Sequence, residues 1–194
     1  MKSMEWKNVT LKQFINLQEL FKIEDETERL ISITELLFGD SVTDLPLVEY
    51  NKKIKELEFL KEEIPTNHLI KNIKVNGKEY VLHGVLGNIT TAQYVDYINH
   101  SKTGDIAKIL SVFFIPKNHK YNDGYDMLEV INDVGCLPMD VVNSTAFFFS
   151  RQLAKFIQIF QSSLQKKIKK MKINDKQKEV MINLLKTLES YHIS

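Results

Sequence analysis

The chain has 194 residues, of which 43% are hydrophobic and 26% charged, with a formal net charge of +1. This composition is typical of a globular protein with a hydrophobic core, and with only 7 Gly and 4 Pro we expect no long disordered linker. No uncharged apolar run approaches the ~20 residues that a membrane helix needs, and the first ten residues lack the apolar core of a signal peptide. We therefore expect a protein of the cytosol that does not bind a membrane.

The two parts of the chain differ in charge. Residues 1–65 carry 9 Lys/Arg and 14 Asp/Glu, a net charge of −5, whereas residues 66–194 carry 17 and 11, a net charge of +6. The opposite charges can neutralise each other within one fold, or they can meet between neighbouring copies in a head-to-tail contact. We favour neutralisation within one fold, and the head-to-tail contact stays open.

Three helices are predicted in the acidic N-terminal part. The first begins after Thr10, because Gln13 stands at the position that completes a capping box. The second carries acidic residues at its start and ends at Gly39, and the third ends before Pro65. Each helix carries apolar residues at helical spacing, so each has one face to bury.

A β-hairpin is predicted over about residues 70–83. Apolar and polar residues alternate there around Asn76-Gly77. That dipeptide favours a type I′ turn, which needs positive φ at both central residues, between strands near 70–75 and 78–83. Because a lone hairpin is marginally stable in water, it must pack on helices or pair with a strand of another chain.

The rest of the chain is predicted to be helical. One helix begins at Thr90, with Gln93 at the capping-box position. An apolar helix over residues 104–116 ends before Pro116, and a short helix covers residues 123–135. A long helix begins near Pro138, and a last helix follows it. The predicted fold class is therefore mainly α, a multi-helix domain with one β-hairpin.

Three regions of the chain are distinguished, and we expect them to form one compact unit. They are an N-terminal acidic helical region (1–65), the hairpin with a helical core (66–172) and a C-terminal helix (173–194).

The segment KNHKYNDGYD, residues 117–126, has the side chains of a metal or acid–base site. A calcium-binding EF-hand needs a Glu six residues after its glycine, and alignment on Gly124 puts Val130 there. A zinc site needs several His or Cys ligands at a metal-binding spacing, which the sequence lacks. We therefore interpret the segment as a connection between two helices, in which Asp123 or Asp126 caps the next helix.

No catalytic motif is found. The sequence contains no G-x-S-x-G, P-loop, G-x-G-x-x-G or H-E-x-x-H pattern. The single cysteine, Cys136, lies in an apolar segment, where we expect a buried small residue rather than a nucleophile. We predict a protein that is not an enzyme and needs no cofactor or metal.

A lysine cluster and a phenylalanine cluster remain. The basic cluster consists of Lys166, Lys167, Lys169, Lys170 and Lys172. It is interpreted as a solvated helix end, with contact to nucleic acid or to an acidic protein surface as the open alternative. The scarcity of Arg does not favour sequence-specific nucleic-acid binding. The interface candidates are Phe147, Phe148, Phe149, Phe156 and Phe160. Three consecutive phenylalanines face different sides of a helix, so the helix is either central or in contact with another chain.

The segments ITTAQYVDYI, ILSVFFIPKNHKYNDGYD and LPMDVVNSTAFFF follow one another in this chain. This order resembles small virion and morphogenesis proteins of tailed bacteriophages of the Bacteroidetes and crAss-like type, with features of tail assembly chaperones. The similarity covers residues 88–160, and FGDSVTDLPLVEYNKKIKELEFL is a weaker second block.

This resemblance implies a non-enzymatic structural or assembly protein, a multimeric component of the tail or neck that is ring- or adaptor-like. Its expected partners are other phage structural proteins and further copies of itself, in a virion assembled in the host cytoplasm. Two alternatives stay open: a tail assembly chaperone that is not retained in the virion, and a nucleic-acid-associated phage accessory protein.

Overall fold

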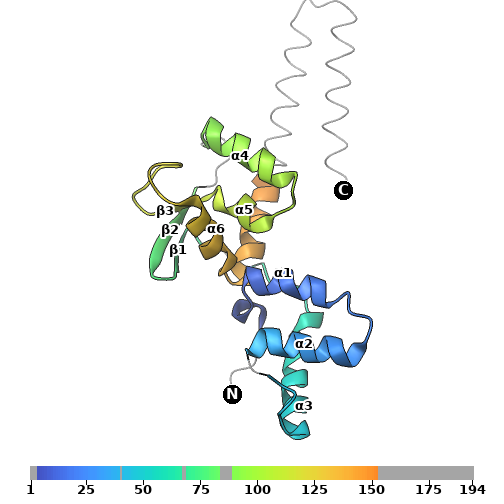
Figure 1. Ribbon diagram of the computed structural model, residues 1–194. Helices are drawn as coiled ribbons and strands as arrows, with labels where there is room; N and C mark the ends of the chain where they lie inside the picture. Colours follow the sequence, from blue (N-terminus) through green and yellow to red (C-terminus); the bar gives the residue numbers. More distant parts are fainter. Residues whose placement is uncertain (1–3, 40, 67–68, 84–88, 153–194) are drawn as a thin grey trace, which may run out of the picture. The chain divides into compact units, whose positions relative to one another are not determined.

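The computed structural model describes residues 4–39, 41–66, 69–83 and 89–152 (Figure 1). The chain divides into two compact units, Met1–Gly84 with Ile89–Ala146 and Val85–Asn88 with Phe147–Ser194. The first unit is mainly helical and contains a small antiparallel sheet, so the predicted fold class is confirmed. Among the residues described, no helix combines the length and the apolar character that crossing a membrane requires.

The N-terminal helices begin and end at the predicted signals. A 3₁₀ turn, η1 (Trp6–Asn8), precedes α1 (Leu11–Leu20). The Thr10 hydroxyl accepts a hydrogen bond from the Gln13 amide (3.2 Å) and the Gln13 side chain accepts one from the Thr10 amide (2.9 Å), so the predicted capping box is confirmed. α2 (Glu26–Phe38) ends at Gly39, whose φ of 74° is the left-handed conformation typical of a helix stop.

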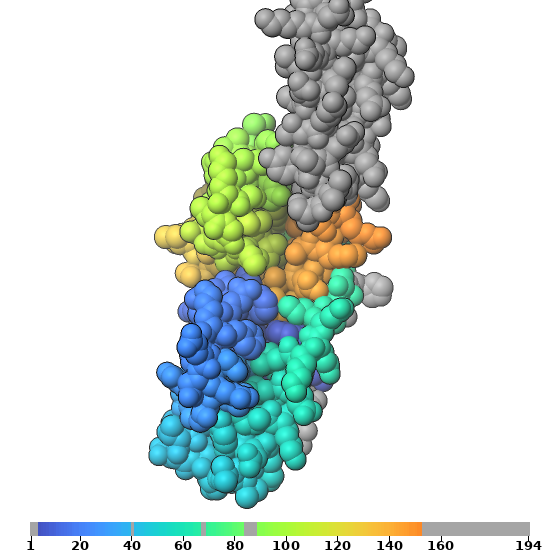
Figure 2. Space-filling view, turned by 90° about the vertical axis from the view of Figure 1, so that its right-hand side faces the viewer, coloured from blue at the N-terminus to red at the C-terminus, as the bar shows by residue number. Residues whose placement is uncertain are grey.

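The third predicted helix is divided into two parts. α3 (Leu47–Glu56) begins after Pro46 and continues as a 3₁₀ turn, η2 (Leu57–Lys61). α1 packs on α2 and α2 packs on α3, and Figures 1 and 2 show the three helices side by side. Trp6 joins α1 to η2, because its ring packs edge-on against Phe14 and Phe59 at centroid distances of 6.0 and 5.2 Å.

The hairpin has the predicted turn. β1 (Asn72–Val75) pairs antiparallel with β2 (Lys78–Leu82), and Val75 is opposite Lys78. The φ angles of Asn76 and Gly77 are 48° and 81°, both positive as a type I′ turn requires.

The predicted apolar helix over residues 104–116 is wrong in its second half. Only α5 (Ile106–Ser111) is helical, and β3 (Phe114–Pro116) is a strand that pairs antiparallel with β2. The strand order is β1-β2-β3. The residue before a proline is disfavoured in the helical region, so Ile115 is extended, and Pro116 suits a strand end because it has no N–H to donate.

The remaining helices of the first unit surround the same core. They are α4 (Thr91–Ser101), α6 (Met127–Gly135) and the first part of a helix over residues 139–152. The N-terminal segment is joined to the start of that last helix by an isolated bridge, in which the Leu11 amide donates to the Leu137 carbonyl (2.9 Å) and the Met139 amide donates to the Val9 carbonyl (2.8 Å).

One hydrophobic cluster joins residues on both sides of position 65. Trp6, Leu17 and Phe59 from the acidic part belong to it, together with Tyr80 and Phe114 from the sheet. The predicted continuation of the 139–152 helix to residue 172, and the predicted C-terminal helix over 173–194, lie outside the described residues.

Candidate functional site

A buried carboxylate connects α6 to the hairpin. Asp133 is 5% exposed and Tyr80 is 2% exposed. One oxygen of the Asp133 carboxylate accepts a short hydrogen bond from the Tyr80 hydroxyl, and the other accepts from Nδ2 of Asn76 at 2.7 Å. Both oxygens of Asp133 therefore have protein donors, and the turn and the central strand are both fixed to α6.

The contact between Tyr80 and Asp133 stabilises the fold and is not arranged for acid–base catalysis. Burial, and after it the hydrogen bond to Asp133, raises the pKa of Tyr80 above its ordinary value. The hydroxyl consequently stays protonated at neutral pH and acts as a donor to the carboxylate. A carboxylate already engaged through both oxygens in a buried position is poorly placed to act as a general base on a substrate.

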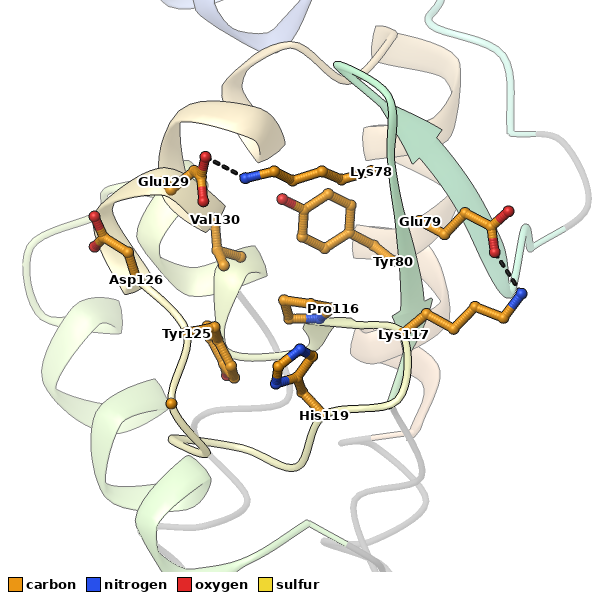
Figure 3. A pocket seen from close by; sticks show the side chains of 11 residues that line it. Lys78, Glu79, Tyr80, Pro116, Lys117, His119, Tyr125, Asp126, Glu129 and Val130 are labelled. Carbon is orange, nitrogen blue, oxygen red and sulfur yellow. Dashed lines mark hydrogen bonds and ion pairs between the residues drawn. The ribbon is translucent and has the colours of Figure 1, made fainter.

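A half-open cavity of about 450 Å³ lies beside this connection, between the sheet, α6 and the loop after β3 (Figure 3). Its cations are paired, because Lys78 forms an ion pair with Glu129 and Lys117 forms one with Glu79. The hydrogen bond and charge of Lys117 lower the pKa of Glu79. Asp126, the remaining carboxylate of the lining, accepts a hydrogen bond from the Leu128 amide.

The 117–126 segment forms part of the cavity wall and connects β3 to α6. The interpretation as a connection is right, but the preceding element is a strand rather than a helix. Asp126 is the cap, because its side chain accepts a hydrogen bond from the Leu128 amide at 2.8 Å. Nδ1 of His119 is bonded to the carbonyl of Asp123 at 3.0 Å, and the His119 ring packs edge-on against Tyr125 at 5.9 Å.

Two further features concern metal binding and the single cysteine. In the described part of the chain, no group of three or more His, Cys, Asp or Glu side chains is arranged to hold a metal ion. Cys136 is exposed, so the prediction that it is buried is wrong. It is the C-cap of α6, and the core positions at this corner are taken by its neighbours Val134 and Leu137.

The phenylalanine cluster is only partly described. Phe147 is exposed, and the rings of Phe148 and Phe149 pack edge-on at a centroid distance of 5.6 Å. The guanidinium of Arg151 lies 5.1 Å from the centre of the Phe147 ring. The candidates Phe156 and Phe160 and the lysine cluster lie outside the described residues.

Sequence reasoning missed an exposed apolar surface on α4. We call it the α4 row, and it consists of Tyr94, Val95 and Ile98, which are 51%, 49% and 36% exposed. These positions share one face of the helix, since residues four apart lie one turn from each other. α4 is part of the molecular surface coloured green in Figure 2.

The opposite face of α4 fixes how the helix is turned. Gln93 is buried, and its Nε2 donates to the carbonyl of Val112 at 3.0 Å. The Asp96 carboxylate accepts from the Tyr121 hydroxyl at 2.7 Å, and Tyr97 packs edge-on against Phe113 at 5.6 Å. These contacts hold Gln93 and Tyr97 inward, so the α4 row faces outward as a consequence.

No protein-family model, curated protein or solved structure matches this chain.

Proposed function

We propose that this protein is not an enzyme and that it works by binding other proteins, as a structural or assembly component of a tailed bacteriophage. The observation that carries the binding proposal is the α4 row, with Tyr94 and Val95 about half exposed. The phage assignment is supported by the resemblance of residues 88–160 to phage morphogenesis proteins.

The α4 row supports protein binding because it is apolar and oriented. An amphipathic helix of a globular protein normally buries its apolar stripe, and contiguous exposed apolar surface commonly marks an interface. Here the inner face of α4 is already occupied, since Gln93 satisfies the Val112 carbonyl and Asp96 accepts from Tyr121. Turning the α4 row inward would break both bonds and leave the Val112 carbonyl and the Tyr121 hydroxyl without their α4 partners, so contact with a partner protein is the less costly way to cover the row.

The proposed partners are other phage structural proteins and further copies of this chain in a tail or neck assembly. A specific interface of this kind buries on the order of 1,200–2,000 Å² in total, with aromatic residues at its centre. Tyr94 is suited to such a centre because it presents a large apolar ring with a polar tip. The head-to-tail contact between the acidic and basic parts of the chain stays a prediction.

The proposal is tested by charging the α4 row. Val95→Glu with Ile98→Glu introduces two carboxylates on the row without touching Gln93 or Asp96. The matched control is Leu128→Glu on α6, where Leu128 is 69% exposed. Circular dichroism first establishes that both variants keep the helix content of the parent.

Particles of the phage that encodes the chain are then purified from hosts supplying each variant, and their proteins are identified by mass spectrometry. We expect the α4 double variant to be lost from the particles or to prevent their assembly, whereas the control variant is retained. Assembly that proceeds unchanged with the double variant would contradict the proposal. Parent protein that is required for assembly but absent from finished particles would identify the chain as an assembly chaperone.

A further inference from the structure

One edge of the small sheet has backbone groups available for a further strand. β1 is an edge strand, because the strand order is β1-β2-β3. The Leu82 amide donates to the Lys71 carbonyl at 2.8 Å, and bonded and non-bonded pairs alternate along an antiparallel ladder. Ile73 is therefore bonded to β2, whereas the N–H and C=O groups of Asn72 and Lys74 point away from it. Within the described ranges, no backbone partner occupies that side.

The other edge of the same sheet is closed. Phe114 and Ile115 of β3 are almost completely buried, so protein atoms cover this strand. β3 ends at Pro116, which has no N–H to offer to a further strand. An added strand can therefore join this sheet at β1.

The side chains on the two faces of β1 indicate which side chains an added strand should have. On the exposed face Lys74 is opposite Glu79, and Glu79 forms an ion pair with Lys117, so the charges alternate across the sheet and end with a cation at the open edge. On the other face Ile73 is partly buried against the core and Val75 is buried. A carboxylate beside Lys74 and apolar side chains beside Ile73 and Val75 would continue both patterns.

We propose that the outer edge of β1 binds an extended segment of a partner protein in which acidic and apolar residues alternate. The segment adds a strand by hydrogen bonding to Asn72 and Lys74, and its carboxylate lies beside Lys74. This inference deepens the proposed function, on which it rests for the partner being a protein, and it concerns a surface separate from the α4 row.

A second copy of the chain is a less suitable occupant. Pairing β1 with β1 of another copy would place Lys74 beside Asn72 or Lys74 of that copy, with no carboxylate from either strand. Lysines on short edge strands are a common feature that disfavours pairing between identical edges. A strand from a different protein can place a carboxylate on the outer side of Lys74, which a second copy of β1 cannot do.

The test uses short capped peptides in which valine alternates either with glutamate or with lysine, each carrying a fluorophore. Binding is measured by fluorescence anisotropy, and the amide of Lys74 is followed by hydrogen exchange. Asn72→Pro removes an outward N–H without removing a bond to β2, and Asn72→Thr is its matched control because it keeps that N–H. Lys74→Glu reverses the edge charge, and Lys102→Glu is the control at an exposed lysine on the C-cap of α4.

We expect saturable binding of the valine–glutamate peptide, slower exchange of the Lys74 amide and little binding of the valine–lysine peptide. Asn72→Pro should weaken binding about three- to tenfold, and Asn72→Thr should leave it within about twofold. Lys74→Glu should lower the affinity for the valine–glutamate peptide about three- to tenfold and raise the affinity for the valine–lysine peptide. Lys102→Glu should change neither affinity. Circular dichroism confirms folding of each variant.

Three results would overturn the inference. They are no binding of the valine–glutamate peptide, equal binding of both peptides, and equal binding by Asn72→Pro and Asn72→Thr. A dimer of the parent protein that Asn72→Pro dissociates would assign the edge to a second copy instead. If peptide binding fails while the charged α4 row still prevents phage assembly, this inference is wrong and the proposed function stands.

Discussion

Replacing Asp133 by alanine should destabilise the first unit by about 1–3 kcal/mol. In Asp133→Ala the Tyr80 hydroxyl loses its acceptor while it remains buried, and an unpaired buried polar group costs about 1–3 kcal/mol. The amide of Asn76 also loses its partner, but Asn76 is exposed and regains water, which limits its share to about 0.5 kcal/mol. Relief of the buried charge offsets part of this loss.

A double-mutant cycle separates the hydrogen bond from these other effects. It compares the parent with Tyr80→Phe, Asp133→Ala and the combined variant. The combined variant has neither the hydroxyl nor the carboxylate, so it should lose less stability than the sum of the single changes, with a coupling of about 1–3 kcal/mol. Tyr94→Phe is the matched control, because Tyr94 is exposed and its change should stay within about 0.5 kcal/mol.

Unfolding in urea is followed by fluorescence of Trp6, which is the only tryptophan and is buried in the first unit. The midpoint reports stability as long as the slope of free energy against urea is unchanged among the variants. A coupling below about 0.5 kcal/mol would show that the carboxylate does not stabilise the hairpin through Tyr80.

Three other predictions concern the turn, alkaline pH and nucleic acid. Gly77→Val should cost about 1–3 kcal/mol in urea unfolding, because a β-branched residue resists the φ of 81°, and Gly77→Asn should cost less. Burial first, and then hydrogen bonds to aspartates, raise the pKa of Tyr80 and Tyr121 above about 10, so the folded state holds these protons more tightly than the unfolded state. The two hydroxyls therefore increase the free energy of unfolding below pH ~10, and this contribution is lost as the pH rises above that value. A variant with both Tyr80→Phe and Tyr121→Phe should lose less stability than the parent between neutral and alkaline pH. A pH profile identical to that of the parent would contradict this assignment. The protein should not bind DNA with submicromolar affinity at physiological salt. Salt-dependent DNA binding that is abolished by changing Lys166, Lys167, Lys169 and Lys170 to glutamine would favour the nucleic-acid alternative.

Features that depend on adjacent residues could be predicted from the sequence. The capping box of Thr10 and Gln13 and that of Thr90 and Gln93 form as their spacing indicates. The Asn76-Gly77 turn forms because its φ requirement is met within two residues. In each case the partner atoms lie within a few residues, so the local sequence contains the whole interaction.

Features that depend on distant residues could not be predicted. β3 belongs to a continuous apolar run, and such a run has no period that distinguishes a strand from a buried helix. Its partner strand pairs Val81 with Ile115, far away in the sequence. The bond between Tyr80 and Asp133 joins positions 53 residues apart, and neither residue belongs to a recognisable motif. The α4 row was missed because the sequence does not show which side of an amphipathic helix the core will occupy.

The hairpin of β1 and β2 is stable only when it packs on other elements, and this packing also determines the state of the proposed binding edge. β3 meets that requirement on one side of β2, and α6 meets it at the turn, where Asp133 engages Asn76 and Tyr80. These contacts hold β1 extended, and within the described part of the chain the outward backbone groups of Asn72 and Lys74 have no strand beside them. A strand that is already ordered loses little conformational entropy when another strand pairs with it, so more of the binding energy remains as affinity. The same contacts that stabilise the hairpin within the chain therefore hold its outer edge in the conformation that the proposed strand addition requires.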